Sequence, residues 1–238
     1  MHILGSKKNQ SGQTLLELIF ALGIMITALT ATIVLIVSSI NASRESRQKL
    51  VATSLAREGI ELARGIRDSN WVTVQYGICT DSGSGVTNEG LPCTSDSFCG
   101  AGTCAHEVWD AGLTGASPAI PVITGSSPYA FDFSVAAFTD QTARIYLNNN
   151  FYRQGAGVTG NPTEYHRLVY LNPICHDAGG AERIVDKFDN YTCGQGGSPV
   201  AAYPETVGYR IISEVRWPDA ASNRKVILED RLYNWQTL

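Results

Sequence analysis

Hydrophobic residues are concentrated in one uninterrupted run near the start of the chain. From Leu15 to Val37 the only ionisable side chain is Glu17. As a helix rising about 1.5 Å per residue, this run would reach roughly 34 Å, which exceeds the bilayer hydrocarbon core of about 30 Å. After residue 70, Gly, Pro, Asn or a charged residue interrupts every apolar stretch. The pattern therefore predicts one membrane-spanning helix, over residues 13–40.

The next segment, residues 41–70, has the pattern of an amphipathic helix. It contains no proline, and charged residues occupy most of its circumference. The remaining apolar positions recur at helical spacing and form one stripe, which consists of Val51, Leu55, Leu62 and Ile66. We therefore expect a single helix from about residue 13 to 69, with its second half resting on a folded domain.

Beyond Trp71 the pattern changes to short alternating runs separated by turn residues, which is typical of β-strands. The candidate strands are 71–76, 129–138, 143–147, 165–171, 207–217 and 224–235. A turn-rich connector joins the last two, which form the clearest hairpin. The predicted fold class is α+β: a long N-terminal helix packed against a C-terminal, mostly antiparallel β-sheet domain, residues 71–238.

Cysteines occur only after the apolar run. Four of them lie within residues 78–128, a Gly-, Ser-, Thr- and Pro-rich segment predicted to be a long surface loop. An even number of cysteines beyond a membrane segment indicates disulfides in an oxidising compartment. Their clustering favours one bridge between Cys175 and Cys193 and two bridges among the other four. The six disulfide candidates are Cys79, Cys93, Cys99, Cys104, Cys175 and Cys193.

The first twelve residues form a short polar leader. It carries Lys7 and Lys8 and no acidic residue. Because positive flanking charge stays cytoplasmic, the N-terminus should be inside and everything after residue 40 outside. Signal-peptidase cleavage within residues 38–42 is an alternative, but the apolar run is about twice the length of a usual signal core.

The overall composition is that of a folded protein without a strong field of one sign. Of the 238 residues, 44% are hydrophobic and 17% charged, and the formal net charge is −4. This balance excludes a disordered chain and gives no basic field of the kind that dominates nucleic-acid binding. No nucleic-acid partner is therefore indicated.

Sequence signals for an enzyme are weak. No glycine-rich phosphate motif precedes a helix, and no G-x-S-x-G turn is present. Two cysteine and histidine groupings could be imagined as metal ligands, but neither has the paired spacing of structural zinc sites. These groupings are Cys99, Cys104 and His106, and Cys175, His176 and Cys193. We expect no enzymatic activity, no cofactor and no metal.

The residues around Glu17 carry a family resemblance. Gly12 is followed by QTLLE, preceded by a lysine-bearing leader and succeeded by the apolar run. This arrangement resembles the class III signal of type IV pilins and pseudopilins. The resemblance implies that a prepilin peptidase of the membrane cuts after Gly12 on the cytoplasmic side and methylates the new amine of Gln13. Glu17 then becomes the fifth residue of the mature chain, as in that family.

Two later segments resemble minor pilins of the type IV pilus modification group. They are residues 55–71, which follow the anchor, and the terminal pattern of strand to Trp217, turn, and strand to Trp235. The resemblance implies a structural subunit that waits in the cytoplasmic membrane. From there it joins other pilin subunits through its N-terminal helix, in a cell-surface or periplasmic filament.

Glu17 has two physical interpretations. A carboxylate at the centre of a span costs about 2.5 to 3.5 kcal/mol, and less near the interface, where headgroups would simply solvate it. In a filament, the α-ammonium of an incoming chain could instead neutralise Glu17 of its neighbour and fix the axial register. Two other functions stay open: a filament-displayed adhesive or ligand-binding surface around residues 79–104, and a signal-anchored ectodomain that never polymerises.

Overall fold

The computed structural model describes most of the chain after the leader. The described residues are 11–76, 78–80, 91, 93, 96–100, 103–105, 109–115, 118–122, 130–135, 137–185, 192–195, 200–218 and 223–234. The chain divides into an N-terminal unit, Met1–Leu50, and a C-terminal unit, Val51–Leu238. One helix, α1, spans Ser11–Tyr76 and contributes to both. Each unit has its own structural character.

In the described part of the N-terminal unit, α1 is the only regular element. Its large apolar side chains between Leu15 and Ile40 remain 49% to 69% exposed. A helix satisfies its own backbone hydrogen bonds, so it can enter a bilayer where exposed irregular backbone cannot. Among the described residues this is the one helix long and apolar enough to cross a membrane.

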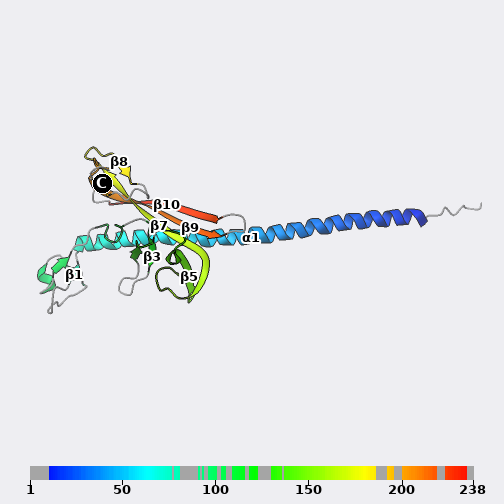
Figure 1. Ribbon diagram of the computed structural model, residues 1–238, viewed down its shortest axis with the longest axis horizontal. Helices are drawn as coiled ribbons and strands as arrows, with labels where there is room; N and C mark the ends of the chain where they lie inside the picture. Colours follow the sequence, from blue (N-terminus) through cyan, green and yellow to red (C-terminus); the bar gives the residue numbers. More distant parts are fainter. Residues whose placement is uncertain are drawn as a thin grey trace, which may run out of the picture. The chain divides into compact units, whose positions relative to one another are not determined.

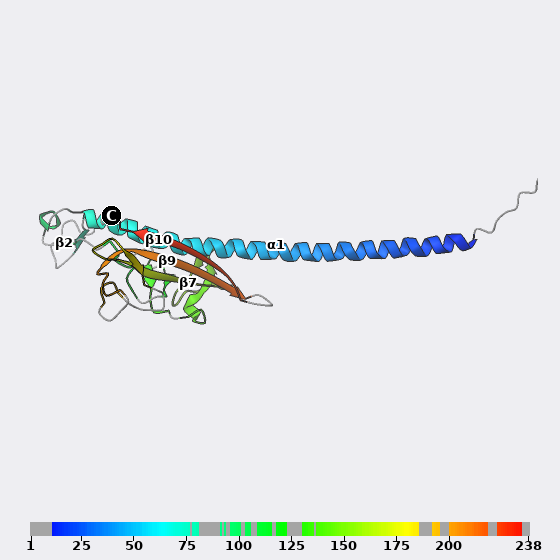
Figure 2. The same ribbon diagram turned by 90° about the horizontal axis from the view of Figure 1, so that it is seen from above.

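The C-terminal unit is built on an antiparallel sheet that lies along α1 (Figures 1 and 2). Its strand order is β10-β9-β7-β5-β6, and β8 pairs with the C-terminal end of β7. Two small sheets, β1-β2 and β3-β4, accompany it. The main strands are β5 (Arg144–Asn148), β6 (Phe151–Arg153), β7 (Asn161–His176), β8 (Glu182–Ile184), β9 (Glu205–Pro218) and β10 (Asn223–Tyr233). The short elements are β1 (Ile78–Thr80), η1 (Asp96–Cys99), β2 (Thr103–Ala105), β3 (Ile120–Val122), β4 (Ala130–Asp132) and η2 (Gln141–Ala143).

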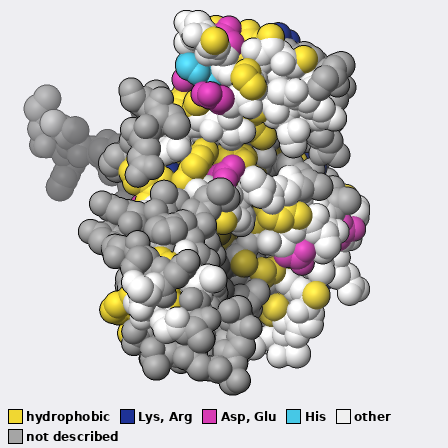
Figure 3. Space-filling view, turned by 90° about the vertical axis from the view of Figure 1, so that its left-hand side faces the viewer, with side chains coloured by type: hydrophobic (Ala, Val, Ile, Leu, Met, Phe, Trp, Pro, Cys, Tyr) yellow, Lys and Arg dark blue, Asp and Glu magenta, His cyan; other side chains and the backbone are white. Residues whose placement is uncertain are grey.

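The C-terminal unit has two distinguishable ends along α1. The chain enters at Val51 and reaches β1 only after the helix ends at Tyr76, so β1 marks the opposite end. Figure 3 looks at the end that carries β1. Its described surface shows several Asp and Glu side chains and very few Lys or Arg. Among the described side chains visible in this view, acidic ones are therefore more frequent than basic ones.

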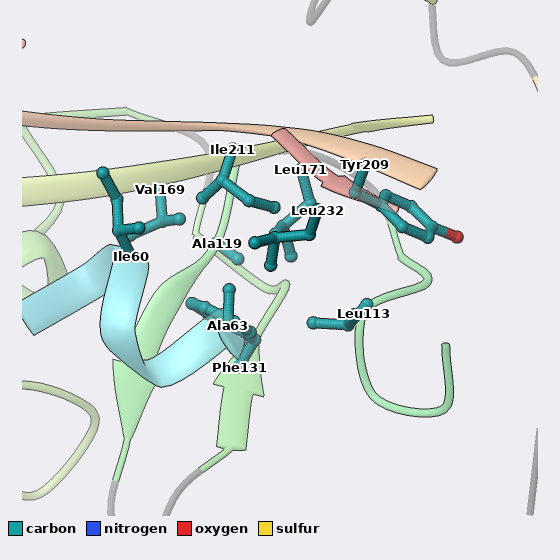
Figure 4. Packing of buried hydrophobic residues seen from close by; sticks show 10 residues of the cluster. All are labelled: Ile60, Ala63, Leu113, Ala119, Phe131, Val169, Leu171, Tyr209, Ile211 and Leu232. Carbon is teal, nitrogen blue, oxygen red and sulfur yellow. The ribbon is translucent and has the colours of Figure 1, made fainter. Parts of the chain in front are cut away.

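Small residues of α1 bring the helix close to one face of the sheet. Ala52, Ala56 and Ala63 are fully buried, and Gly59 is buried between them. A Cβ added at Gly59 would lie 2.7 Å from Ser213 Oγ and 3.0 Å from Val169 Cγ2. Figure 4 shows the cluster next to this contact, formed by Ile60, Ala63, Leu113, Ala119, Phe131, Val169, Leu171, Tyr209, Ile211 and Leu232. A methyl group at residue 59 would require the side chains of Ser213 and Val169 to move.

A buried polar network joins α1 to the sheet beside this contact. The Arg167 side chain is 2% exposed and donates to the carbonyl oxygen of Leu55 at 2.8 Å and to Glu58 Oε2 at 3.0 Å. Its Nε donates to Gln154 Oε1, and Gln154 Nε2 in turn donates to the carbonyl oxygens of Ala143 and Arg167. A buried guanidinium needs hydrogen-bond acceptors for its N–H groups. The network therefore holds β7 against α1 and fixes which side of the helix faces the sheet.

The predicted fold class and the C-terminal hairpin are confirmed, with β9 and β10 close to their expected bounds. The predicted strand at 71–76 is wrong, since these residues continue α1. Their β-branched residues favour a strand, but buried Asn70 donates to the carbonyls of Trp109 and Ala111 and holds the last turns on a loop. The predicted strand 129–138 shrinks to β4 and ends in a turn.

The apolar stripe and the cysteine-rich loop also differ from expectation. Of the predicted stripe only Leu55 is fully buried, whereas Val51, Leu62 and Ile66 pack at the margins of the core. Alanine and glycine occupy the centre instead, because close approach needs small side chains. The described parts of residues 78–128, expected to be a long surface loop, contain three short strands and a 3-10 turn.

Candidate assembly segment, disulfide-linked loop and cationic face

Glu17 lies on the exposed apolar part of α1. It is an exposed residue with neighbours such as Leu16 and Leu18 that are 60% and 61% exposed. Within the described part of the chain its carboxylate makes no hydrogen bond or ion pair. The lack of a partner among the described residues leaves this charge available to a group from another molecule.

Four hydroxyl groups of the same segment are satisfied internally. Thr27, Thr30, Thr32 and Ser38 each donate to a helix carbonyl three or four residues earlier, at 2.8 to 2.9 Å. Such back-bonding lets a hydroxyl enter an apolar medium without an unmade hydrogen bond. Glu17 therefore differs from these polar residues, since a carboxylate cannot donate a hydrogen bond to a helix carbonyl and its charge stays unneutralised.

The predicted processing residues fall at the edge of the described chain. Gly12 and Gln13 lie in the first turns of α1, whereas Lys7 and Lys8 lie outside the described residues. The expected cut after Gly12 would therefore leave a mature chain that begins within the helix. Cleavage and methylation stay predictions.

The three disulfides group the cysteines as their clustering predicts. Cys175 is joined to Cys193, and the other four form Cys79–Cys99 and Cys93–Cys104. Strands β1 and β2 place Cys79 directly opposite Cys104, yet each bonds to a cysteine elsewhere in the loop. Cys79, Cys93 and Cys99 are at most 3% exposed and bring their sulfurs within 4.8 Å of one another. The two bridges thus form a small core of their own.

The same bridges decide between the metal and disulfide interpretations of the cysteines. A thiolate ligand needs a free sulfur, and no described cysteine is free. His176 is half-buried beside Cys175, whereas His106 lies outside the described residues. Both groupings that could have been metal ligands are therefore held as disulfides in this structure.

A row of basic residues crosses the sheet on the face away from α1. Register pairs Arg144 with His166, His166 with Arg216, and Arg216 with Lys225, on β5, β7, β9 and β10. Residues directly opposite in a sheet share a face. Arg153 of β6 is opposite Tyr146, two residues from Arg144, so it lies on this face as well. We call these five residues, Arg144, Arg153, His166, Arg216 and Lys225, the cationic face.

A buried carboxylate forms an ion pair with the cationic face. Glu214 is 1% exposed, and its Oε1 accepts a hydrogen bond from Arg216 Nε at 2.8 Å. The Arg216 guanidinium also lies 4.0 Å from the centre of the Phe138 ring. Burial, followed by the Glu214 carboxylate, raises the pKa of Tyr170. Burial, followed by the Arg144 charge, lowers the pKa of His166.

Comparison with known proteins identifies no relative of this chain. No family model, curated protein or solved structure matches this chain. The α+β fold and the disulfides are thus established by the structure itself, and the function must be argued from residues.

Sequence analysis missed the cationic face and the Arg167 network. The basic residues are far apart along the chain and meet only through strand register, which no local pattern reports. Arg167 lies in a strongly apolar strand, and a lone arginine among buried positions was the available signal. A charged residue there needs a partner from another element.

Proposed function

We propose that the chain is a minor pilin-like structural subunit of a type IV pilus or related filament, cut after Gly12 and assembled through α1. The observation that carries this proposal is Glu17, a carboxylate that is exposed on an apolar helix and has no partner among the described residues. Its distance from Gly12 along the chain matches the class III signal that the leader and apolar run resemble. The subunit resides in the cytoplasmic membrane before assembly, with its C-terminal unit outside.

The exposed helix supports this proposal on packing grounds. Apolar side chains from Leu15 to Ile40 have no covering partner in the described chain, and lipid covers them before assembly. In a filament the same side chains would pack on neighbouring helices. The amine released at Gln13 would lie one helical turn from Glu17 of its own chain, and would pair with Glu17 of an adjacent chain. An unpaired buried charge costs about 3 to 5 kcal/mol, so the pairing would set the stagger between subunits.

Two measurements test the proposal. Mass spectrometry of the mature protein should find Gln13 as its first residue, with or without a methyl group. An intact Met1, or a cut near residue 42, would refute the processing step.

The assembly step is tested with Glu17→Gln, which removes the charge and keeps the size. We expect normal insertion in the membrane fraction and at least a tenfold loss from the sheared filament fraction, measured by immunoblot. Glu45→Gln is the matched control, because Glu45 lies on the same helix and already pairs with Lys49 at 2.7 Å. Equal filament incorporation of both variants would refute the role of Glu17 in assembly, and absence of the unsubstituted chain from the filament fraction would favour an anchor that never polymerises.

A further inference from the structure

The cationic face has an electrostatic arrangement that the described residues balance only in part. Three consecutive cross-strand pairs join basic residues: Arg144 with His166, His166 with Arg216, and Arg216 with Lys225. Like charges directly opposite one another destabilise a sheet, and Arg216 and Lys225 form such a pair. His166, whose pKa is lowered below 6.5, is neutral at pH 7 and lies between the charged Arg144 and Arg216. Only Arg216 has an ion-pair partner among the described residues, namely Glu214. A surface of this kind is stabilised when an external anion covers it.

The side chains of this face are accessible to such an anion. Arg153 and Lys225 are exposed, and the Arg216 side chain is 42% exposed. Arg144 and His166 are half-buried, and Arg144 donates its Nε hydrogen to the carbonyl of Thr163, which fixes its direction. Strands lie about 4.8 Å apart, so the row from β5 to β10 is about 14 Å long. It suits several anionic groups side by side better than one small ion.

The cationic face lies at the end of the C-terminal unit where the chain enters. Its residues alternate along the strands with Ile145, Tyr165, Val215 and Trp217, which pack on Ala52, Leu55 and Ala56 of α1. Residues 41–50 alone separate that end from the apolar segment, and they span at most about 35 Å even if fully extended. In Figure 3 the described surface of the opposite end, around β1, shows more Asp and Glu than Lys or Arg. Arg144, Arg153, Arg216 and Lys225 thus lie together near the end where the tether to the membrane begins.

An exposed aromatic residue accompanies the basic ones. Phe151 of β6 is 66% exposed and lies on the cationic face, two residues from Arg153. The neighbouring Tyr152 is 37% exposed. Aromatic rings together with Lys and Arg are the residues that proteins place at the membrane interface. Free phosphate would bind the charges but would leave Phe151 in water.

We infer that the cationic face binds the anionic headgroups of the bilayer that holds α1, with Phe151 entering the interface. This inference rests on the membrane anchoring in the proposed function, but it does not require polymerisation. Each basic residue near an anionic surface is expected to strengthen the contact about fivefold. The contact would hold the C-terminal unit on the membrane and would have to break when the subunit leaves for a filament.

Amide hydrogen exchange on the full chain in lipid nanodiscs tests this inference. Discs of phosphatidylcholine alone are compared with discs that also contain phosphatidylglycerol. Segments around Arg144–Arg153 and Arg216–Lys225 should exchange at least threefold more slowly in the anionic discs. The difference should vanish at about 1 M salt, where the Debye length is about 3 Å. Equal exchange in both discs overturns the inference.

Two double variants show whether the protection depends on the cationic face or only on the overall charge of the protein. Arg153→Gln with Lys225→Gln removes two exposed charges and leaves Arg216 to its buried partner Glu214. It should abolish the protection, whereas Arg183→Gln with Arg231→Gln removes two exposed charges elsewhere and should retain it. Loss of protection in both variants would show a nonspecific charge effect and overturn the inference.

Two further outcomes distinguish failure of the lipid contact from failure of the proposed filament role. Variant-sensitive binding of a single-stranded oligonucleotide, without lipid-dependent protection, would replace the membrane by a nucleic acid as the ligand. An uncut Gly12 together with lipid-dependent protection would refute the proposed filament role and leave the lipid contact standing.

Discussion

Gly59 provides the sharpest test of how the helix packs on the sheet. Its hydrogen faces Ser213 and Val169, and a methyl group would lie 2.7 Å from Ser213 Oγ. Gly65, six residues further along α1, is exposed and has nothing within 4 Å of an added Cβ. The same substitution by alanine at these two positions should therefore change stability in opposite directions.

The magnitudes follow from two opposing effects. Alanine favours a helix over glycine by about 1 kcal/mol, and this gain applies at both positions. At residue 59 it is offset by overpacking, which costs about 1 to 3 kcal/mol in a close-packed interior. We expect Gly65→Ala to stabilise the C-terminal unit by about 1 kcal/mol and Gly59→Ala to destabilise it by about 1 kcal/mol. In Tm these changes correspond to about 2 to 4 °C in either direction.

Ser213 supplies an internal check on the same contact. Its hydroxyl is fully buried and has no hydrogen-bond partner in the described structure. An unmade buried hydrogen bond costs about 1 to 3 kcal/mol, so Ser213→Ala should raise stability. It also removes the atom nearest the new methyl group of Gly59→Ala. The free energy of unfolding of the double variant Gly59→Ala, Ser213→Ala should therefore be about 1 kcal/mol higher than the sum of the two single effects predicts.

Thermal unfolding of the disulfide-intact full chain in detergent, followed by near-UV circular dichroism, measures all four variants. The near-UV signal reports the aromatic core of the C-terminal unit rather than the helix content of the apolar segment. If Gly59→Ala raised Tm as much as Gly65→Ala does, the close helix–sheet contact would be refuted.

Two more variants test the buried charges. Arg167→Leu should lower the stability of the C-terminal unit by about 2 kcal/mol, because a helix carbonyl and a glutamine lose their donors; an unchanged denaturant midpoint would refute the network. Burial, followed by the Arg144 charge, lowers the pKa of His166 below its ordinary value of 6.5. The unfolded chain therefore takes up this proton first, and stability should fall as pH drops below 6.5, a decline that His166→Gln should reduce in pH-dependent unfolding.

The sequence predicts features that depend on neighbouring residues more reliably than those that depend on the fold. The apolar helix and the β9–β10 hairpin were predictable because periodicity and turn residues act locally. Residues 71–76 were mistaken for a strand because the contacts of Asn70 with a loop far along the chain extend the helix. The burial of Gly59 could not be anticipated either, since a glycine in a helix pattern signals weakness until its neighbours are known.

The candidate site divides along the same line. Gly12 and Glu17 can be recognised from the sequence because they lie close together along the chain. Arg144 and Lys225 lie on the same face of the sheet only because the four strands β5, β7, β9 and β10 pair with one another in a particular register. Register depends on which face of each strand is buried, and that is a property of the assembled core.

The two bridges of the β1–β2 loop interleave along the chain, since Cys93 lies inside the loop closed by Cys79 and Cys99. A chain emerging N-terminus first presents Cys79 and Cys93 together before either native partner is available. If these two oxidise at once, the product is a wrong bridge that must be reopened by a thiolate, a reaction of seconds to hours without assistance. Maturation of this protein is therefore expected to depend on a disulfide isomerase, and cells with only an oxidase should accumulate mispaired chains.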